Sequence, residues 1–204
     1  MDIILASASP RRTELLKQIG ITHRIMASDF EEQLSAQKTP AENAAALALG
    51  KADSVALKLQ QGLVIGADTV VVLDGQILGK PKTLQEAQWM LEQLSGRTHQ
   101  VMTAVAIVDA SGQQETWQRV EVTEVTFRTL DEPMLQWYLA TGESMDKAGA
   151  YGIQGYGALL VEKINGCYFN VVGLPLVRVA EGLERFGVDI CGKQGNEIYD
   201  QGLS

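Results

Sequence analysis

Residues 63–73 read LVIGADTVVVL, an apolar run of strand length that is broken by one charged side chain, Asp68. A run without polar alternation predicts a strand buried on both faces, as strands are when helices cover both sides of a sheet. Asp74-Gly75 predicts the turn that ends this strand. The stretch therefore favours an α/β fold with helices flanking a sheet.

The rest of the chain predicts further elements from apolar periodicity, caps and turn residues. In chain order these are a strand at 3–6, a helix from Ser9-Pro10 to Gly20, a helix at 40–59 capped by Thr39, a helix at 83–94 capped by Thr83, a β-hairpin over 99–127, a helix at 131–141, a glycine-rich loop at 142–157, a second hairpin from ALLVEKI (158–164) through Asn165-Gly166 to YFNVV (168–172), and a helix from Pro175 to Phe186. Strands and helices do not strictly alternate, so we expect a mixed, twisted sheet. We predict one domain over 1–190 and a polar tail at 191–204.

Composition argues against several classes of protein. The formal charge of −8 disfavours a nucleic-acid partner, because phosphate binding over a surface needs a basic face. No stretch approaches the roughly 18 apolar residues of a membrane span, and the acidic N-terminus is unlike a secretion signal, so we predict a cytoplasmic protein without a membrane partner. Cys167 and Cys191 lack CxxC spacing and are expected to be reduced thiols.

Asp68 is the first candidate for chemistry. A carboxylate inside an apolar strand is costly unless it is paired or bound to a metal, and its pKa is then movable, as a general base requires. The alternative is a structural aspartate whose oxygens accept from backbone amides. With only His23 and His99 in the chain, a zinc site is not expected, and any metal would be a hard cation such as Mg²⁺ or Mn²⁺ on carboxylates.

Phosphate binding is suggested by the segment SASPRR at 7–12. A helix N-terminus attracts anions, so Arg11 and Arg12 in its first turn make sense mainly if a phosphate is drawn there. The alternative is a solvated arginine pair beside an ordinary cap formed by Ser9. GKP at 79–81 superficially resembles a P-loop, but the spacing is one residue short and Pro81 stands where Ser or Thr should be, so we reject a Walker A motif.

Two weaker signals lie elsewhere. Glu31 and Glu32 could share a cation with Asp68, although acidic runs are more often solvated loops. The segment DKAGAYGIQG at 146–155 supplies glycines for close backbone approach and Gln154, whose amide can both donate and accept, as the O4 and N3–H edge of uracil or thymine requires. A tight structural loop would explain the glycines equally well.

Several motifs in one order resemble the Maf nucleotide pyrophosphatases, from about residue 3 to 186. They are LASASPRRTELL, the acidic pair, LALGKA, VIGADTVV, GKP, SGRTHQVMTAV, MDKAGAYGIQG and NVVGLP. The resemblance implies an α/β fold related to the house-cleaning ITP pyrophosphatases, with a cleft between two lobes and a requirement for a divalent cation. Homodimers occur in that family, so the resemblance also allows a homodimer.

The resemblance also implies roles for individual residues. Asp68 matches the family's proposed base, with metal binding as its alternative role. Glu31 aligns best with the acid implicated near the metal, with Glu32 as the alternative. The phosphate-site positions of the family fall on Ser7, Arg11, Arg12, Lys51 and Lys80. One departure is Gly50, where many relatives carry a polar or charged residue.

The expected substrate follows from three positions, because Arg12, Thr69 and Gln154 resemble the dTTP/UTP-preferring group rather than the 7-methyl-GTP-preferring group. We therefore expect hydrolysis of dTTP and UTP, with 5-methyl-UTP and pseudo-UTP as further candidates, to the monophosphate and pyrophosphate. The alternatives are a pyrophosphatase for a methylated purine, and a nucleotide-binding regulator of septum formation.

Overall fold

The computed structural model describes residues 1–190. Residues 191–204, the predicted polar tail, lie outside the described part, so the domain boundary at 190 stays a prediction. The strands of the described chain are β1 (Ile3–Leu5), β2 (Arg24–Ile25), β3 (Leu63–Leu73), β4 (Gln76–Leu78), β5 (Thr98–Asp109), β6 (Trp117–Phe127) and β7 (Val161–Asn165). The helices are α1 (Pro10–Gln18), α2 (Pro40–Ala56), α3 (Leu84–Leu94), α4 (Glu132–Ala140), η1 (Ala148–Ala150), η2 (Gly155–Leu159), α5 (Tyr168–Val172) and α6 (Leu176–Arg185). No helix in this part of the chain is long and apolar enough to cross a membrane.

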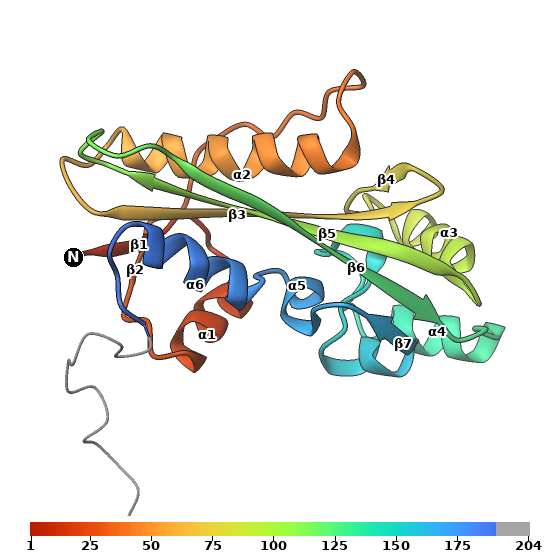
Figure 1. The fold of residues 1–204 in the computed structure, drawn as a ribbon. Helices are drawn as coiled ribbons and strands as arrows, with labels where there is room; N and C mark the ends of the chain where they lie inside the picture. The colour runs from red at the N-terminus through yellow and green to blue at the C-terminus, as the bar shows by residue number, and fades with distance from the viewer. Residues whose placement is uncertain (191–204) are drawn as a thin grey trace, which may run out of the picture.

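The strands form one mixed sheet in the order β2-β1-β3-β5-β6-β7, with β4 also paired to β3. β1 pairs in parallel with β2 and β3, and the other pairs are antiparallel. The predicted mixed, twisted sheet is confirmed, and β5 and β6 are the predicted hairpin. Figure 1 shows α2 on one face of the long strands and α1, α5 and α6 on the other.

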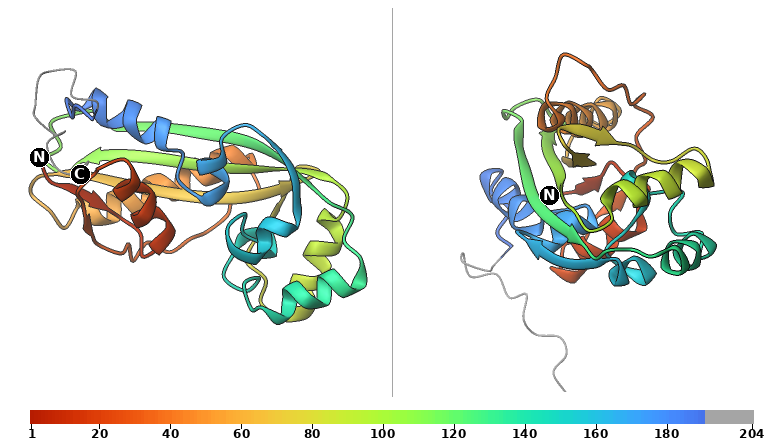
Figure 2. Two further views of the ribbon diagram at one scale, coloured as in Figure 1. Left: turned by 90° about the horizontal axis from the view of Figure 1, so that it is seen from below. Right: turned by 90° about the vertical axis from the view of Figure 1, so that its right-hand side faces the viewer.

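Two groups of elements lie at opposite ends of the long strands β3, β5 and β6. Figure 2 shows α1 and α6 beside one end and α3 and α4 beside the other, which gives the two predicted lobes. The side chains of β3 alternate between two cores, as the period of a strand requires. Val64, Val70 and Val72 pack beneath α2, whereas Ile65 and Val71 pack in the larger core on the opposite face.

One predicted element is wrong. YFNVV at 168–172 is the short helix α5 rather than the second strand of a hairpin, and β7 pairs with β6 instead. Periodicity cannot distinguish a five-residue apolar run in a strand from one in a helix. Asn170 supplies the physical reason: its buried side-chain amide accepts from the Thr103 N–H and donates to the Val101 carbonyl, so a side chain rather than a paired backbone joins this segment to β5.

β3 has a gap in its pairing on one side. β1 pairs with Leu63–Ile65 and β4 with Val71–Leu73, so residues 66–70 have a neighbouring strand only on the side of β5. Gly66 lies in this gap, where a Cβ would come within 2.2 Å of the Ala48 carbonyl oxygen of α2. Glycine therefore allows α2 to approach the strand closely, immediately before the sequence Asp68-Thr69.

Candidate active site

A cavity of about 750 Å³ opens at this gap in the sheet. Because neighbouring residues of a strand point to opposite faces, Asp68 and Thr69 enter the cavity from opposite sides of β3. Leu47 and Lys51 of α2 line it on one side, and Arg12 of α1 lines it on the other. The cavity therefore joins the two faces of the sheet and has two chemically different walls.

Lys51 forms the centre of the first wall. Its Nζ lies 2.6 Å from Asp68 Oδ1 and 2.7 Å from Glu32 Oε1, so one ammonium bridges two carboxylates. The Asp68 residue is only 6% exposed. Burial raises the pKa of its carboxyl above the ordinary value, although Lys51 and Arg12 act in the opposite direction. Asp68 is thus held where a carboxylate gains a proton more readily than in water.

Glu32 responds differently to the same lysine. Burial alone would raise its pKa, but the hydrogen bond and charge of Lys51, with smaller contributions from Lys80 and Arg12, bring the pKa below its ordinary value. Two carboxylates on one ammonium therefore have pKa values shifted in opposite directions, a pattern that separates a proton acceptor from a group that stays ionised.

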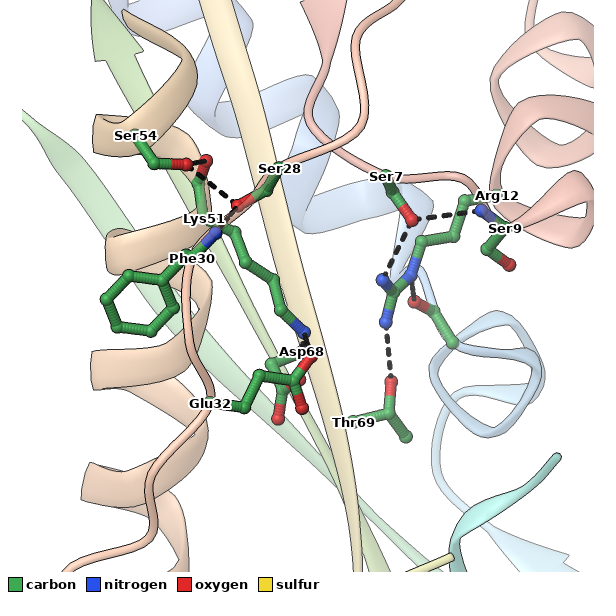
Figure 3. Close-up of polar contacts among 11 residues, drawn as sticks. Ser7, Ser9, Arg12, Ser28, Phe30, Glu32, Lys51, Ser54, Asp68 and Thr69 are labelled. Atoms are coloured by element: carbon green, nitrogen blue, oxygen red, sulfur yellow. Dashed lines mark hydrogen bonds and ion pairs between the residues drawn. The ribbon is translucent and has the colours of Figure 1, made fainter. Parts of the chain in front are cut away.

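An extended segment, residues 26–38, brings Glu32 to the cavity by running along α2, and we call it the strap (Figure 3). Ser28 Oγ lies 2.7 Å from Ser54 Oγ, and Lys58 Nζ lies 2.7 Å from Asp29 Oδ2. The Phe30 ring lies against Gly50, where a Cβ would come within 2.4 Å of it. Gly50 therefore has a packing role, since it leaves room for this ring.

Arg12 forms the centre of the second wall. Its Nε donates to the Gly173 carbonyl at 2.9 Å, Nη1 to Ser7 Oγ at 3.2 Å and Nη2 to Thr69 Oγ1 at 3.3 Å. These partners come from three separate parts of the chain and are all neutral oxygens. Burial lowers the pKa of the guanidinium. Because its three hydrogen bonds fix the side chain and all go to neutral oxygens, its charge is available to an anion in the cavity.

Thr69 continues this wall into the sheet. Its Oγ1 lies 2.9 Å from Thr103 Oγ1, which donates to the Asn170 carbonyl at 2.9 Å. Thr103 and Asn170 are fully buried, and sequence reasoning did not single them out. A usable signal was present in YFNVV, because a lone asparagine within an apolar run must find partners, as Asp68 must in its own run.

A family model described as "Maf-like protein" matches residues 2–186. The chain belongs to the Maf family. Among curated relatives, the "dTTP/UTP pyrophosphatase" of Moorella thermoacetica is 53% identical over 191 residues, covering 94% of this chain and 98% of the relative. The protein of the same name from Pelotomaculum thermopropionicum is 50% identical over 189 residues, covering 93% and 98%.

The fold of this Maf-family chain also occurs in a solved structure. The HAM1 protein of Coxiella burnetii matches with a TM-score of 0.50 at 15% identity, covering 91% of this chain and 99% of the other. At that identity the match concerns the fold alone. It agrees with the predicted α/β fold.

The structure gathers most of the residues that the Maf resemblance singled out. The members that line the one cavity are Arg11, Arg12, Glu32, Lys51, Asp68, Thr69, Lys80 and Gln154. Ser7 is outside the lining, and its hydroxyl instead accepts from Arg12 and from the Ser9 backbone N–H at 3.2 Å. Ser9 occupies the N-cap position of α1 without a side-chain cap. Ser7 therefore holds Arg12 in place rather than facing the cavity.

The acidic pair divides in the Maf site. Both side chains are exposed, but Glu32 lines the cavity and Glu31 does not, so the strap presents the second acid rather than the one that aligned best. Within residues 1–190 no cluster of three or more His, Cys, Asp or Glu side chains could hold a metal. The two carboxylates that contact Lys51, those of Glu32 and Asp68, do fit Mg²⁺ or Mn²⁺. These ions bind through one or two protein carboxylates, and water and substrate phosphates complete the coordination.

Proposed function

We propose that this chain hydrolyses dTTP and UTP to the nucleoside monophosphate and pyrophosphate. The observation that carries the proposal is the pairing of two walls in one cavity: Asp68 with its lysine on one side of β3, and Thr69 with Arg12 on the other. A nucleotide needs both kinds of surface, one for reaction at phosphorus and one for recognition. The relatives named dTTP/UTP pyrophosphatase support the substrate class.

In the proposed mechanism Asp68 acts as general base. Lys51 contacts Oδ1, which leaves Oδ2 to take a proton from the water that attacks the α-phosphorus. The new P–O bond forms as the bond to the β-phosphate oxygen breaks, and pyrophosphate leaves. Lys80 and Arg11 line the same cavity and would offset the charge that develops on the departing group.

A divalent cation would be held by Glu32 and Asp68. Bound there, Mg²⁺ or Mn²⁺ would supply further positive charge to the phosphates. Lys51 bridges the two carboxylates and so keeps them close together. The proposal places the enzyme in the cytoplasm, because that is where its nucleotide substrates are made and used.

The test is Asp68→Asn, assayed for pyrophosphate and orthophosphate release from dTTP, UTP and 7-methyl-GTP with Mg²⁺ or Mn²⁺. We expect turnover of dTTP to fall by about 10²- to 10⁴-fold, the usual contribution of a general base. Asp53→Asn is the matched control, because Asp53 is a partly buried carboxylate of α2 whose pKa is also raised by burial but which does not line the cavity.

Four results would count against the proposal. Orthophosphate as the only product would remove the pyrophosphatase activity, and faster turnover of 7-methyl-GTP than of dTTP would favour the purine alternative. Near-normal turnover in Asp68→Asn at saturating metal would show that Asp68 is not the base. Tight binding of dTTP by the wild type without any hydrolysis would favour a nucleotide-binding regulator.

A further inference from the structure

Three oxygen atoms form a row behind the Arg12 wall of the cavity. Thr69 Oγ1, on the cavity side, lies 2.9 Å from Thr103 Oγ1, and Thr103 Oγ1 lies 2.9 Å from the backbone carbonyl oxygen of Asn170. Thr69 and Thr103 are directly opposite each other in the β3–β5 ladder, so both side chains leave the sheet on the same face. Thr69 lines the cavity, and Figure 3 shows it below the Arg12 guanidinium.

The positions of the protons in this row follow from counting donors. Each close oxygen–oxygen contact needs one proton, and the carbonyl of Asn170 has none to give. Thr103 must therefore donate to Asn170, and its oxygen can then only accept from Thr69. The Thr69 hydroxyl proton is consumed in this contact, and one of its lone pairs already accepts from Arg12 Nη2. Any other arrangement leaves two oxygens facing each other at 2.9 Å without a proton.

We propose that Thr103 and the Asn170 carbonyl are positioning groups that hold Thr69 as a hydrogen-bond acceptor, so that this wall selects a base with a ring N–H donor. The proposal rests on the proposed nucleotide substrate and names the group that Thr69 recognises. Uracil and thymine carry a hydrogen on N3, whereas N3 of cytosine has only a lone pair. With Thr69 fixed as an acceptor, uracil or thymine donates a hydrogen bond from N3–H. Cytosine instead places the lone pair of its N3 against the lone pair of the Thr69 oxygen.

The surroundings of the row hold it in this arrangement. Besides its bonds to β5, the Asn170 side-chain amide donates to Thr123 Oγ1 at 2.9 Å, which fixes α5 against both β5 and β6. The Asn170 carbonyl also accepts from the Gly173 N–H at 3.0 Å, so it keeps a partner if Thr103 is replaced. Removal of the Thr103 hydroxyl should thus release the Thr69 proton without leaving a buried carbonyl unpaired.

The test compares Thr103→Val with Thr103→Ser. Valine keeps the branched shape but cannot accept, so the Thr69 hydroxyl can turn its proton into the cavity and donate to cytosine N3. We expect the ratio of kcat/KM for dTTP over dCTP to fall by about tenfold in T103V, in the range of one hydrogen bond, and to stay within about twofold of wild type in T103S. Thr103→Cys, whose thiol is a weak acceptor, makes the same test if T103V does not fold.

Thr123→Val is the matched control. Thr123 is equally buried on the neighbouring strand and holds the same segment, with its hydroxyl donating to the Cys167 carbonyl at 3.2 Å, but no hydrogen bond joins it to Thr69. An unchanged dTTP/dCTP ratio in T123V together with a lower ratio in T103V supports the proposal. An equal loss in both variants, or an unchanged ratio in T103V, overturns it.

Dissociation constants of dUMP and dCMP, measured by calorimetry on the same variants, separate this proposal from the proposed activity. If the wild type releases no pyrophosphate but T103V still narrows the difference between dUMP and dCMP binding, the pyrophosphatase proposal fails and the role of Thr103 stands. If the wild type hydrolyses dTTP but T103V changes neither ratio, the role of Thr103 fails alone. If the wild type binds dUMP no better than dCMP, Thr69 does not select an N3–H donor.

Discussion

Gly50→Ala is expected to separate stability from activity, because Gly50 lies inside α2 and also beneath the Phe30 ring of the strap. Glycine in a helix interior costs about 1 kcal/mol relative to alanine, so the substitution stabilises α2 by about that amount. The new Cβ would lie 2.4 Å from the ring and must displace it. A ring that is already 39% exposed has about 1 to 2 kcal/mol of burial to lose, so the net change in the free energy of unfolding should be within about 1 kcal/mol of zero.

The activity should respond more than the stability. Glu32 follows Phe30 by two residues and reaches Lys51 only because the strap lies along α2. When the ring is displaced, we expect the Mg²⁺ concentration for half-maximal hydrolysis to rise severalfold, with KM for dTTP changing less. Denaturant unfolding and metal titration of G50A, Phe30→Ala and the double variant measure both effects.

The double-mutant cycle measures the coupling energy between Phe30 and residue 50. In the Phe30→Ala background, G50A should show the full helix stabilisation of about 1 kcal/mol, since no ring remains to be displaced. Equal stabilisation in both backgrounds, or an unchanged metal titration in G50A, would refute the argument that Phe30 and Gly50 hold the strap.

Three further variants test the two walls and the core. Lys51→Met removes the cation that opposes the raised pKa of Asp68, so that pKa should rise further and the acid limb of the pH–rate profile should move to higher pH; a shift to lower pH would contradict this. Arg12→Lys cannot reproduce the three bonds of the guanidinium, and we expect kcat/KM for dTTP to fall by about 10²-fold or more, with little change if the arginine supplied only charge. His99, 2% exposed, has its pKa lowered by burial from 6.5 to about 4. Its neutral form is thus favoured in the folded state, and about 3 kcal/mol of stability should be lost as pH falls from 6.5 to 4; unfolding of His99→Gln across that range should show a shallower loss.

The sequence predicted the central strand and its acid for physical reasons. An apolar run of eleven residues has few alternatives to a buried strand, and the cost of burying a carboxylate identifies Asp68 without any structure. Arg12 was detected for a related reason, because a basic residue at a helix N-terminus needs an explanation. Both signals are local conflicts between a residue and its predicted surroundings.

Other parts of the site depend on distances that a single sequence does not contain. Nothing local to α2 indicates that Lys51 bridges Asp68 and Glu32, and nothing in the acidic pair decides between Glu31 and Glu32. That choice depends on how the strap lies along a helix, which Phe30 and Gly50 settle through packing. Thr103 was hidden for a simpler reason, because threonine is an ordinary residue in a strand.

Asp68 and Thr69 lie where β3 is paired on one side only, and this position limits how the gene can change. Adjacent residues can serve the two walls only because strand side chains alternate. Whether a residue of this strand faces Lys51 or Arg12 therefore depends on its position being even or odd. Inserting or deleting one codon between Leu63 and Asp68 would turn the acid toward Arg12 and the hydroxyl toward Lys51, even if every residue type of the motif were kept. Substitutions can tune each wall separately, but changes of length in this strand should be absent from functional descendants.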